Sequence, residues 1–299
     1  GVSGMGTKEE DWVEQIFVAS THDYLMFFTR NGQCYWLKVY EIPQGSRISR
    51  GKPIVNLINI TPSDKLAALV PVRVFSNDRY LMFATRKGVV KKTALSAYGN
   101  VRSVGLNAIN ISEGDELIDV QITNGDDEVV LATRTGLAIR FHEEDVRPMG
   151  RPATGVRGIR LRRNDEVVGM VVVRRTHEDE ATLLVVTDRG MGKRSEIADY
   201  RLQHRGGKGV INVRVTEKTG AVCAIKQVLP DEELMLMSRK GVVNRQRVGE
   251  IRVIGRATQG VRLMALDEGD EVMDVARLIA EEEDEVAVTA DTVAPGGSG

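Results

Sequence analysis

The sequence predicts an all-β disc built from repeated four-stranded units of about fifty residues. Three observations predict it: a glycine that recurs at regular spacing, strand-like alternation after each of these glycines, and weak helical periodicity throughout. The recurring glycines are Gly51, Gly105, Gly155, Gly209 and Gly260, with gaps of 54, 50, 54 and 51 residues. Four short strands at this period are typical of a propeller-like array, in which each unit buries its faces against its neighbours.

The first strand of each unit directly follows the recurring glycine. Apolar residues alternate with polar ones in 105–111, 155–161 and 209–215. Alternation with a period of two indicates a strand with one buried face. Ten residues after the glycine, an acidic pair leads into a second strand, as at Asp115-Glu116, Asp165-Glu166 and Asp270-Glu271. We interpret these acids as turn residues that discourage strand pairing at edges, rather than as paired catalytic carboxylates.

A third and a fourth strand form a hairpin in each unit. The hairpin turns are closed by Gly88, Gly136, Gly190 and Gly241, because glycine supplies the positive φ that such turns need. The N-terminus keeps the same register, with a turn at Gly32 and a first repeat glycine at Gly1.

The predicted organisation is a disc domain over 1–280, with repeats from about residues 1, 51, 105, 155, 209 and 260. Five of these units are full, and the sixth stops after two strands. Two β-sandwiches side by side would not explain glycines in one register. Propellers of the Trp-Asp and kelch types share the period, but the Trp-Asp signature is missing and Trp12 and Trp36 are the only tryptophans.

Composition describes a folded chain of 299 residues, 42% hydrophobic and 28% charged. Cys34 and Cys223 lie too far apart in the sequence to suggest a disulfide framework or a metal site, so we expect buried thiols in a reducing cytoplasm. No run reaches the roughly 18–20 apolar residues of a membrane helix, and no signal-peptide pattern opens the chain. We therefore expect a cytoplasmic protein.

The formal net charge of −1 conceals an uneven distribution. Residues 281–299 hold six acids and no bases, which leaves 41 basic against 36 acidic residues, or +5, on the rest of the chain. We expect 281–299 to be an acidic, disordered tail. A mildly basic body is compatible with nucleic-acid binding.

Basic residues are phased with the repeat. One set lies about four residues before the recurring glycine: Arg47, Arg102, Arg151, Arg205 and Arg256. More bases crowd the same loops: Arg50, Lys52, Arg147, Arg157, Arg201, Lys208, Arg252 and Arg262. A second set lies four residues after the hairpin glycine: Lys92, Arg140, Arg194 and Arg245. Two of its members directly follow a lysine, Lys91 or Lys193.

Loops of one type lie at one height on a disc, so these bases predict a charged ring suited to a wrapped duplex. Lys and Arg on phosphates release counterions and give salt-sensitive, sequence-independent binding. Solvated surface charge is the alternative, and the phasing argues against it. A protein-interaction propeller would instead use an apolar or mixed face and show little salt dependence.

Residues for catalysis are missing from the sequence pattern. His22, His142, His177 and His204 are isolated from one another and from both cysteines, so no nucleophile with a base and no metal cluster is predicted. The glycines around Lys208 lack the spacing of a phosphate-binding Walker loop. We expect no catalytic residue, no metal and no cofactor in this chain.

The run Gln203, His204, Arg205, Gly206, Gly207, Lys208 and Gly209 resembles the Q-R-R-G-G-K-G box of DNA gyrase A subunits, with His204 in place of the first arginine. Segments 38–43, 50–57, 89–93, 154–161 and 258–261 are also similar to the C-terminal domain of those subunits. The resemblance covers about residues 1–280. It adds the seven box residues to the DNA-binding candidates above.

The resemblance implies a six-bladed β-pinwheel, a disc with exchanged strands that wraps duplex DNA in a right-handed, positive sense. It further implies a holoenzyme with two gyrase A and two gyrase B subunits, which uses ATP and Mg to introduce negative supercoils and is associated with the nucleoid. The ATPase and the cleavage tyrosine would lie outside this chain, so none of its tyrosines is a candidate. The acidic tail could compete with DNA for the basic rim.

One departure concerns the box itself. In the family the box lies in the first repeat. In this sequence the first repeat begins at Gly1, which corresponds to the final glycine of the motif. The role of 203–209 as the functional box is therefore a hypothesis. The related subunit of topoisomerase IV generally lacks the box and has a more degenerate domain, and it stays the close alternative. The regular repeats favour gyrase.

Overall fold

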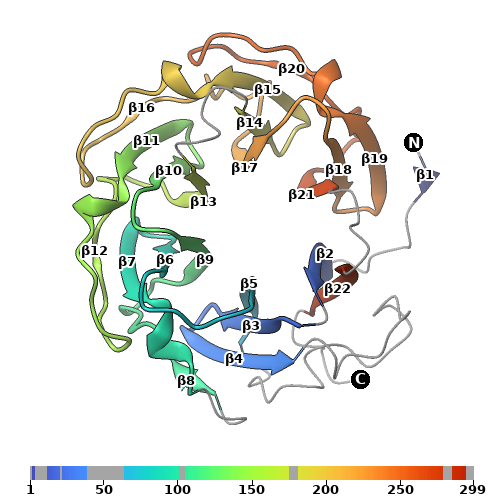
Figure 1. Ribbon diagram of the computed structural model, residues 1–299. Coiled ribbons are helices and arrows are strands. Elements are labelled where there is room, and N and C mark those ends of the chain that lie inside the picture. The colour runs from blue at the N-terminus through green and yellow to red at the C-terminus, as the bar shows by residue number, and fades with distance from the viewer. Residues whose placement is uncertain are drawn as a thin grey trace.

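The computed structural model is a ring of small antiparallel sheets (Figure 1). It describes residues 2–3, 12–20, 22–38, 64–100, 105–174, 181–278 and 285–293. Among these residues, no helix is long and apolar enough to cross a membrane. The all-β, propeller-like fold predicted from the repeat is confirmed.

Four kinds of strand recur around the ring. The inner strands around the centre are β5 (Leu66–Val72), β9 (Leu117–Thr123), β13 (Val167–Val173), β17 (Val222–Val228) and β21 (Val272–Leu278). The first hairpin strands are β3 (Tyr24–Thr29), β6 (Tyr80–Thr85), β10 (Glu128–Thr133), β14 (Thr182–Thr187) and β18 (Glu233–Ser238). The second hairpin strands are β4 (Gln33–Lys38), β7 (Val89–Ala94), β11 (Leu137–His142), β15 (Met191–Glu196) and β19 (Val242–Arg247).

The outermost strands have two residues each, because only a short part of the predicted first strand pairs. They are β1 (Val2–Ser3), β8 (Leu106–Asn107), β12 (Val156–Arg157), β16 (Val210–Ile211) and β20 (Val261–Arg262). Short 3₁₀ helices follow four of the hairpins: η3 (Leu95–Tyr98), η4 (Glu143–Asp145), η6 (Ile197–Asp199) and η7 (Val248–Glu250).

Strands are exchanged between units, as the resemblance implied. The sheet with the order β5-β3-β4-β8 takes its hairpin from one unit, its inner strand from the next and its outer strand from the unit after that. The sheets around β6-β7, β10-β11 and β14-β15 repeat this order. Every sheet is therefore completed by residues far along the chain.

The number of blades differs from the prediction. The described residues form five four-stranded sheets and one two-stranded sheet, so the structure has five complete blades and the prediction of six is wrong. The two-stranded sheet pairs β2 (Trp12–Ser20) with β22 (Glu285–Val293) and lies between β21 and β5 (Figure 1). Beyond β21, the described chain supplies one further strand and no complete hairpin.

The same strand corrects the prediction for the tail. Residues 281–299 were expected to be disordered, but Glu285–Val293 form β22. The sequence of β22, EVAVTADTV, is rich in valine and threonine, and β-branched residues favour strands. This propensity, together with a pairing partner in β2, outweighs the acidic content of the segment.

The N-terminal strand closes the ring. Val2 pairs with Val243 and Ser3 with Val242, so β1 takes the outer position of the fifth sheet, β1-β19-β18-β21. The first and last units thus share one sheet. Figure 1 shows this sheet next to β2 and β22.

The cores lie between neighbouring sheets. Phe28 of one hairpin meets Phe83 of the next edge to face, with ring centroids 5.6 Å apart, and Tyr98 packs on both. Three further clusters are mainly aliphatic, with Tyr200 in one and Phe141 in another. Cys34 and Cys223 are free thiols, and burial raises the pKa of both.

The acidic pairs act as the turn residues that the sequence predicted. The Asp165 carboxylate accepts hydrogen bonds from the Thr135 backbone N–H at 3.0 Å and from its hydroxyl at 2.6 Å, in the hairpin turn of the preceding unit. Asp115 accepts the Lys87 N–H in the same way, at 2.9 Å. Each acid therefore satisfies a turn and links two units.

Candidate nucleic-acid interface

Much of the described perimeter of the ring is formed by three equivalent stretches of chain, 143–160, 197–214 and 248–265, which we call the outer segments. Each runs from a 3₁₀ helix through a loop into a short outer strand, β12, β16 or β20. Figure 1 shows these strands along the outside of the ring. Any ligand that encircles the disc meets these segments first.

The outer segments present many of the predicted basic residues to solvent. The exposed ones are Arg147, Arg157, Arg201, His204, Lys208, Arg252 and Arg262. Arg245 is also exposed, on β19, where it is paired with Glu233. Arg47, Arg50, Lys52 and Arg102 lie outside the described residues. The structure thus gathers bases from three successive units on one surface.

The second phased set is mostly buried, which corrects the prediction that it contacts DNA. Lys92, Arg140 and Arg194 are less than 8% exposed, so they cannot reach a phosphate. Their side chains donate to carbonyl oxygens of the outer segments instead. Lys92 Nζ lies 3.1 Å from the Glu143 oxygen, Arg140 Nη1 3.0 Å from that of Tyr200, and Arg194 Nε 2.9 Å from that of Ile251.

Two of these buried bases have buried carboxylate partners. Arg140 Nε lies 2.6 Å from Glu128 Oε2, and Lys92 Nζ lies 3.6 Å from Glu143 Oε2. Glu143 also accepts the Thr123 hydroxyl at 2.7 Å. A buried charge costs several kcal/mol unless it is paired and hydrogen-bonded, which explains these partners. For Arg194, burial lowers the pKa.

Lys91 and Lys193, also predicted to contact DNA, are fully buried beside the second set. Lys91 Nζ donates to the carbonyl oxygens of Ala108 at 2.6 Å and Arg151 at 2.5 Å. Lys193 Nζ donates to Ser195 Oγ at 2.7 Å. Burial, followed by the nearby Arg151 charge, lowers the pKa of Lys91 to about 7, and burial lowers that of Lys193 to about 8.

The first phased set joins neighbouring outer segments. Arg205 Nε donates to the Asp145 carbonyl at 3.0 Å and its Nη1 to the Arg157 carbonyl at 3.1 Å. Arg256 makes the equivalent bonds to the carbonyls of Asp199 and Ile211. Arg151, Arg205 and Arg256 are half-buried. Arg205 and Arg256 thus fix the spacing between neighbouring outer segments, and all three arginines keep part of the side chain accessible.

The loop 203–209 is held against the preceding outer segment. The Gly206 N–H donates to the Gly158 carbonyl at 2.7 Å, and the Gly207 carbonyl accepts the Arg160 N–H at 2.8 Å. Gly209 has φ +77°, and a Cβ there would lie 2.4 Å from the Ala138 carbonyl oxygen. The glycines are therefore needed for backbone shape and close approach.

Gln203 folds back over this loop. Its Oε1 lies 3.0 Å from the position that a Cβ on Gly207 would take, so a larger residue there would require the amide to shift. His204 is exposed and lies 3.3 Å from Asp145. Lys208 is exposed. The loop thus offers two basic side chains on a tightly built backbone.

On the outer segments, sequence reasoning missed two exposed bases, Arg160 and Arg214. Both lie five residues after a recurring glycine, and their N–H groups donate to Gly207 and Thr258 of the next outer segment. The alternation in 155–161 and 209–215 carried the signal, because each follows a buried residue, Ile159 or Val213.

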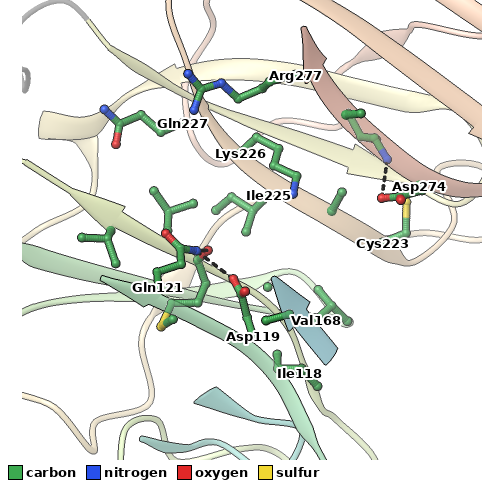
Figure 2. A pocket seen from close by; sticks show the side chains of 18 of the residues that line it. Ile118, Asp119, Gln121, Val168, Cys223, Ile225, Lys226, Gln227, Asp274 and Arg277 are labelled. Carbon is green, nitrogen blue, oxygen red and sulfur yellow. Dashed lines mark hydrogen bonds between the residues drawn. The ribbon is translucent and has the colours of Figure 1, made fainter. Parts of the chain in front are cut away.

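The centre of the ring contains a different site. A cavity of about 500 Å³ lies between the inner strands, and Asp119, Gln121, Lys226 and Asp274 line it (Figure 2). Gln121 Nε2 donates to Asp119 Oδ2 at 2.7 Å. Burial raises the pKa of both aspartates, and Lys226 opposes the shift. Arg277 also lines the cavity, so two acids are balanced by two bases, and the cavity lacks the surplus of bases seen on the perimeter.

Comparison with known families gives a match over most of the chain. The family model described as "DNA gyrase C-terminal domain, beta-propeller" matches residues 23–73, 79–124, 127–174, 181–227 and 232–278. Each matched stretch runs from a hairpin to the inner strand of the next unit, which is the pairing seen in each sheet.

Individual relatives agree with the family match. The chain is 45% identical over 286 residues to the DNA gyrase A protein of Staphylococcus aureus (strain NCTC 8325 / PS 47), covering 95% of this chain and 32% of that protein. The gyrase A protein of strain MRSA252 is 43% identical over 299 residues, covering 100% and 34%. The chain thus spans about a third of the length of the curated relatives it matches.

Two solved structures are similar along most of their length. The C-terminal domain of DNA topoisomerase IV superposes with a TM-score of 0.79 at 28% identity, covering 88% of this chain and 81% of that one. The C-terminal domain of DNA gyrase A superposes with a TM-score of 0.77 at 25% identity, covering 93% and 91%.

Proposed function

Because this chain belongs to the family of DNA gyrase C-terminal domains, we propose that it binds duplex DNA along its perimeter and wraps it. One observation carries the proposal: exposed bases recur on three successive outer segments, at Arg147, Arg201 and Arg252 among others. The bases follow the direction in which a wrapped duplex would run.

Phosphate contacts would supply most of the affinity. Each Lys or Arg that neutralises a phosphate releases counterions, and this gain does not depend on base sequence. Bending a site of 20–30 base pairs by 40–90° costs on the order of 1–6 kcal/mol, which a continuous row of backbone contacts offsets. Glycines in 203–209 also allow backbone N–H groups to approach phosphates closely.

In the whole enzyme, we propose that wrapping presents a nearby DNA segment for strand passage, so that negative supercoils are introduced. The partners are the rest of gyrase A and the gyrase B protein, two copies of each, in the cytoplasm at the nucleoid. ATP and Mg would act in those other parts. Loop 203–209 would serve as the box that supports supercoiling.

The corresponding domain of topoisomerase IV is the second candidate, supported by the structural match. The near-copy of the box at 203–209 and the 45% identity to gyrase A favour gyrase. Ligation of nicked plasmid in the presence of the chain separates the two: a right-handed wrap shifts the linking number in the positive direction, and an unchanged distribution favours topoisomerase IV.

The direct test measures binding to linear duplexes of increasing length at several salt concentrations, with a fluorescent donor and acceptor on the DNA ends. We expect salt-dependent affinity and, above a threshold length, ends that approach each other. Absence of binding at low salt would reject the proposal and favour a protein-interaction propeller.

A further inference from the structure

Exposed apolar side chains gather on the perimeter beside the bases. The described residues have six exposed large apolar side chains, and four of them lie on two outer segments: Leu202 (53% exposed), Ile211 (43%), Val253 (39%) and Val261 (38%). Single exposed apolar residues are ordinary on protein surfaces. Leu202 and Val253, however, occupy the same position in successive units, seven residues before the recurring glycine, and exposed Pro148 occupies it in the unit before.

The backbone at these positions is fixed. The N–H groups after Pro148, Leu202 and Val253 donate to the carbonyls of Lys92, Arg140 and Arg194 at 2.8, 3.0 and 2.8 Å. Those three buried bases also donate from their side chains to the same outer segments. Two sets of bonds therefore hold each apolar side chain outward.

The residue before each of these three is an exposed arginine: Arg147, Arg201 or Arg252. An apolar protein partner would have to desolvate these arginines without a counter-charge, which is costly. Duplex DNA can contact both the arginine and the apolar side chain favourably, because phosphates alternate with the C–H faces of deoxyribose along each strand. The charges beside the apolar side chains thus favour DNA as the partner.

We propose that Leu202 and Val253, with Pro148 in the equivalent place, pack against deoxyribose of the wrapped duplex while the preceding arginines contact the flanking phosphates. The inference rests on the proposed DNA binding and adds a second, apolar component to it. Deoxyribose is the same at every nucleotide, so such contacts keep binding independent of sequence.

Insertion between base pairs is the other way in which an apolar side chain can contact DNA. Wedges inserted from the minor groove kink the duplex toward the major groove, away from the wedge. On this disc, such a kink would bend DNA away from the perimeter and oppose wrapping. The proposed contact therefore leaves base stacking intact.

The test compares the 299-residue chain with the double variant Leu202→Ser/Val253→Ser. A more conservative pair, Leu202→Gln/Val253→Thr, guards against a change in folding. Val74→Ser is the matched control, because Val74 is 66% exposed and lies outside the outer segments. Affinity is measured at several salt concentrations, approach of the DNA ends by energy transfer, and stacking by 2-aminopurine fluorescence.

Both double variants are expected to bind DNA about three- to tenfold more weakly, because part of the apolar burial is lost, and to bring the ends less close together. The slope of log affinity against log salt stays that of the unsubstituted chain, and 2-aminopurine fluorescence does not rise on binding. Val74→Ser behaves like the unsubstituted chain. Arg201→Ser/Arg252→Ser, by contrast, lowers the salt slope.

Unchanged affinity and end approach in both double variants would overturn the inference. So would a lower salt slope, which would mean that phosphate contacts had been lost, or a rise in 2-aminopurine fluorescence, which would indicate insertion. Each of these results leaves the proposed function standing, provided that the unsubstituted chain binds. If the unsubstituted chain fails to bind at low salt, the proposed function itself fails.

Discussion

Arg194 is a basic residue that stabilises an outer segment although its own side chain is buried. Its guanidinium is buried and donates to the Ile251 carbonyl. We expect Arg194→Met to lower the free energy of unfolding by about 1–3 kcal/mol, because a buried carbonyl loses its partner. Urea unfolding measures this loss.

Arg194→Lys is the matched variant, since Lys92, at the equivalent position of another unit, also donates to a carbonyl of an outer segment. We expect it to retain most of the stability. In neither variant should the salt slope of DNA binding change. A lower slope in folded Arg194→Met would show that the side chain reaches a phosphate after all.

Lys91 makes stability depend on pH. Its pKa is about 7 in the folded chain and near the ordinary lysine value of 10.5 when unfolded. Between these values the unfolded state binds more protons, so stability rises with pH from about 7 to about 10, on the order of 1 kcal/mol per unit. Urea unfolding at pH 7, 8 and 9 should show a steeper rise for the unsubstituted chain than for Lys91→Met, and parallel profiles would contradict this.

The two phased sets show that a sequence repeat does not predict which of the repeated bases are exposed. Arg194 of the second set and Arg256 of the first recur with equal regularity, yet Arg194 is buried and Arg256 keeps part of its side chain accessible. Phasing reports that a position is repeated and says nothing about the side of the strand on which it lies. Burial of a base also needs a partner such as Glu143 or a carbonyl, and these partners come from other units. The exchange that brings them together cannot be deduced from periodicity.

At the scale of elements, loop 203–209 combines a constrained backbone with exposed charge. Gly209→Ala should destabilise the chain by about 1–3 kcal/mol, because it needs φ +77° and places a Cβ against the Ala138 carbonyl. Gly255→Ala is the control, since its nearest neighbour would be Thr258 Cγ2 at 4.0 Å. Thermal unfolding compares them, and equal midpoints would contradict the close approach.

Substitutions of Lys208 and Arg205 distinguish an effect on DNA binding from an effect on stability within the same loop. Lys208→Ala should weaken DNA binding and reduce the salt slope by up to about one, with unchanged stability. Arg205→Ala should change both, because its guanidinium joins the carbonyls of Asp145 and Arg157. Salt titrations paired with urea unfolding measure the two effects. An unchanged slope in Lys208→Ala would remove that residue from the interface.

Sequence periodicity predicted the strands and turns of each unit better than it predicted the number of blades. Within the described residues, the recurring glycines from Gly105 onward, the hairpin turns and the acidic turn residues appear where the repeat placed them. The blade count and the tail were wrong, because both depend on pairing between the two ends of the chain. Trp12–Ser20 and Glu285–Val293 pair with each other although they lie more than 260 positions apart.

At the scale of the whole molecule, two residues of β1 join the first unit to the fifth sheet. Deleting 1–3 removes β1 and leaves the edge of β19 unpaired. We expect a loss of about 1 kcal/mol in unfolding free energy and a greater tendency to self-associate. Replacing Val2 and Ser3 with threonines keeps the backbone pairing and serves as the control. Urea unfolding and sedimentation measure both effects, and identical behaviour of the deletion would show that β1 adds nothing.

The exchange of strands also sets the order in which the chain can fold during its synthesis. A hairpin that leaves the ribosome still lacks its inner strand from the next unit and its outer strand from the unit after that. In four of the sheets the outer strand ends 63–69 residues after the hairpin, so these sheets are complete only when the next unit and the start of the one after it have been translated. The sheet of β18 and β19 instead takes its outer strand from β1, which is translated before them. Completion of these sheets therefore trails translation of their hairpins by more than sixty residues, and β2 waits longest, because its partner β22 follows more than 260 residues later.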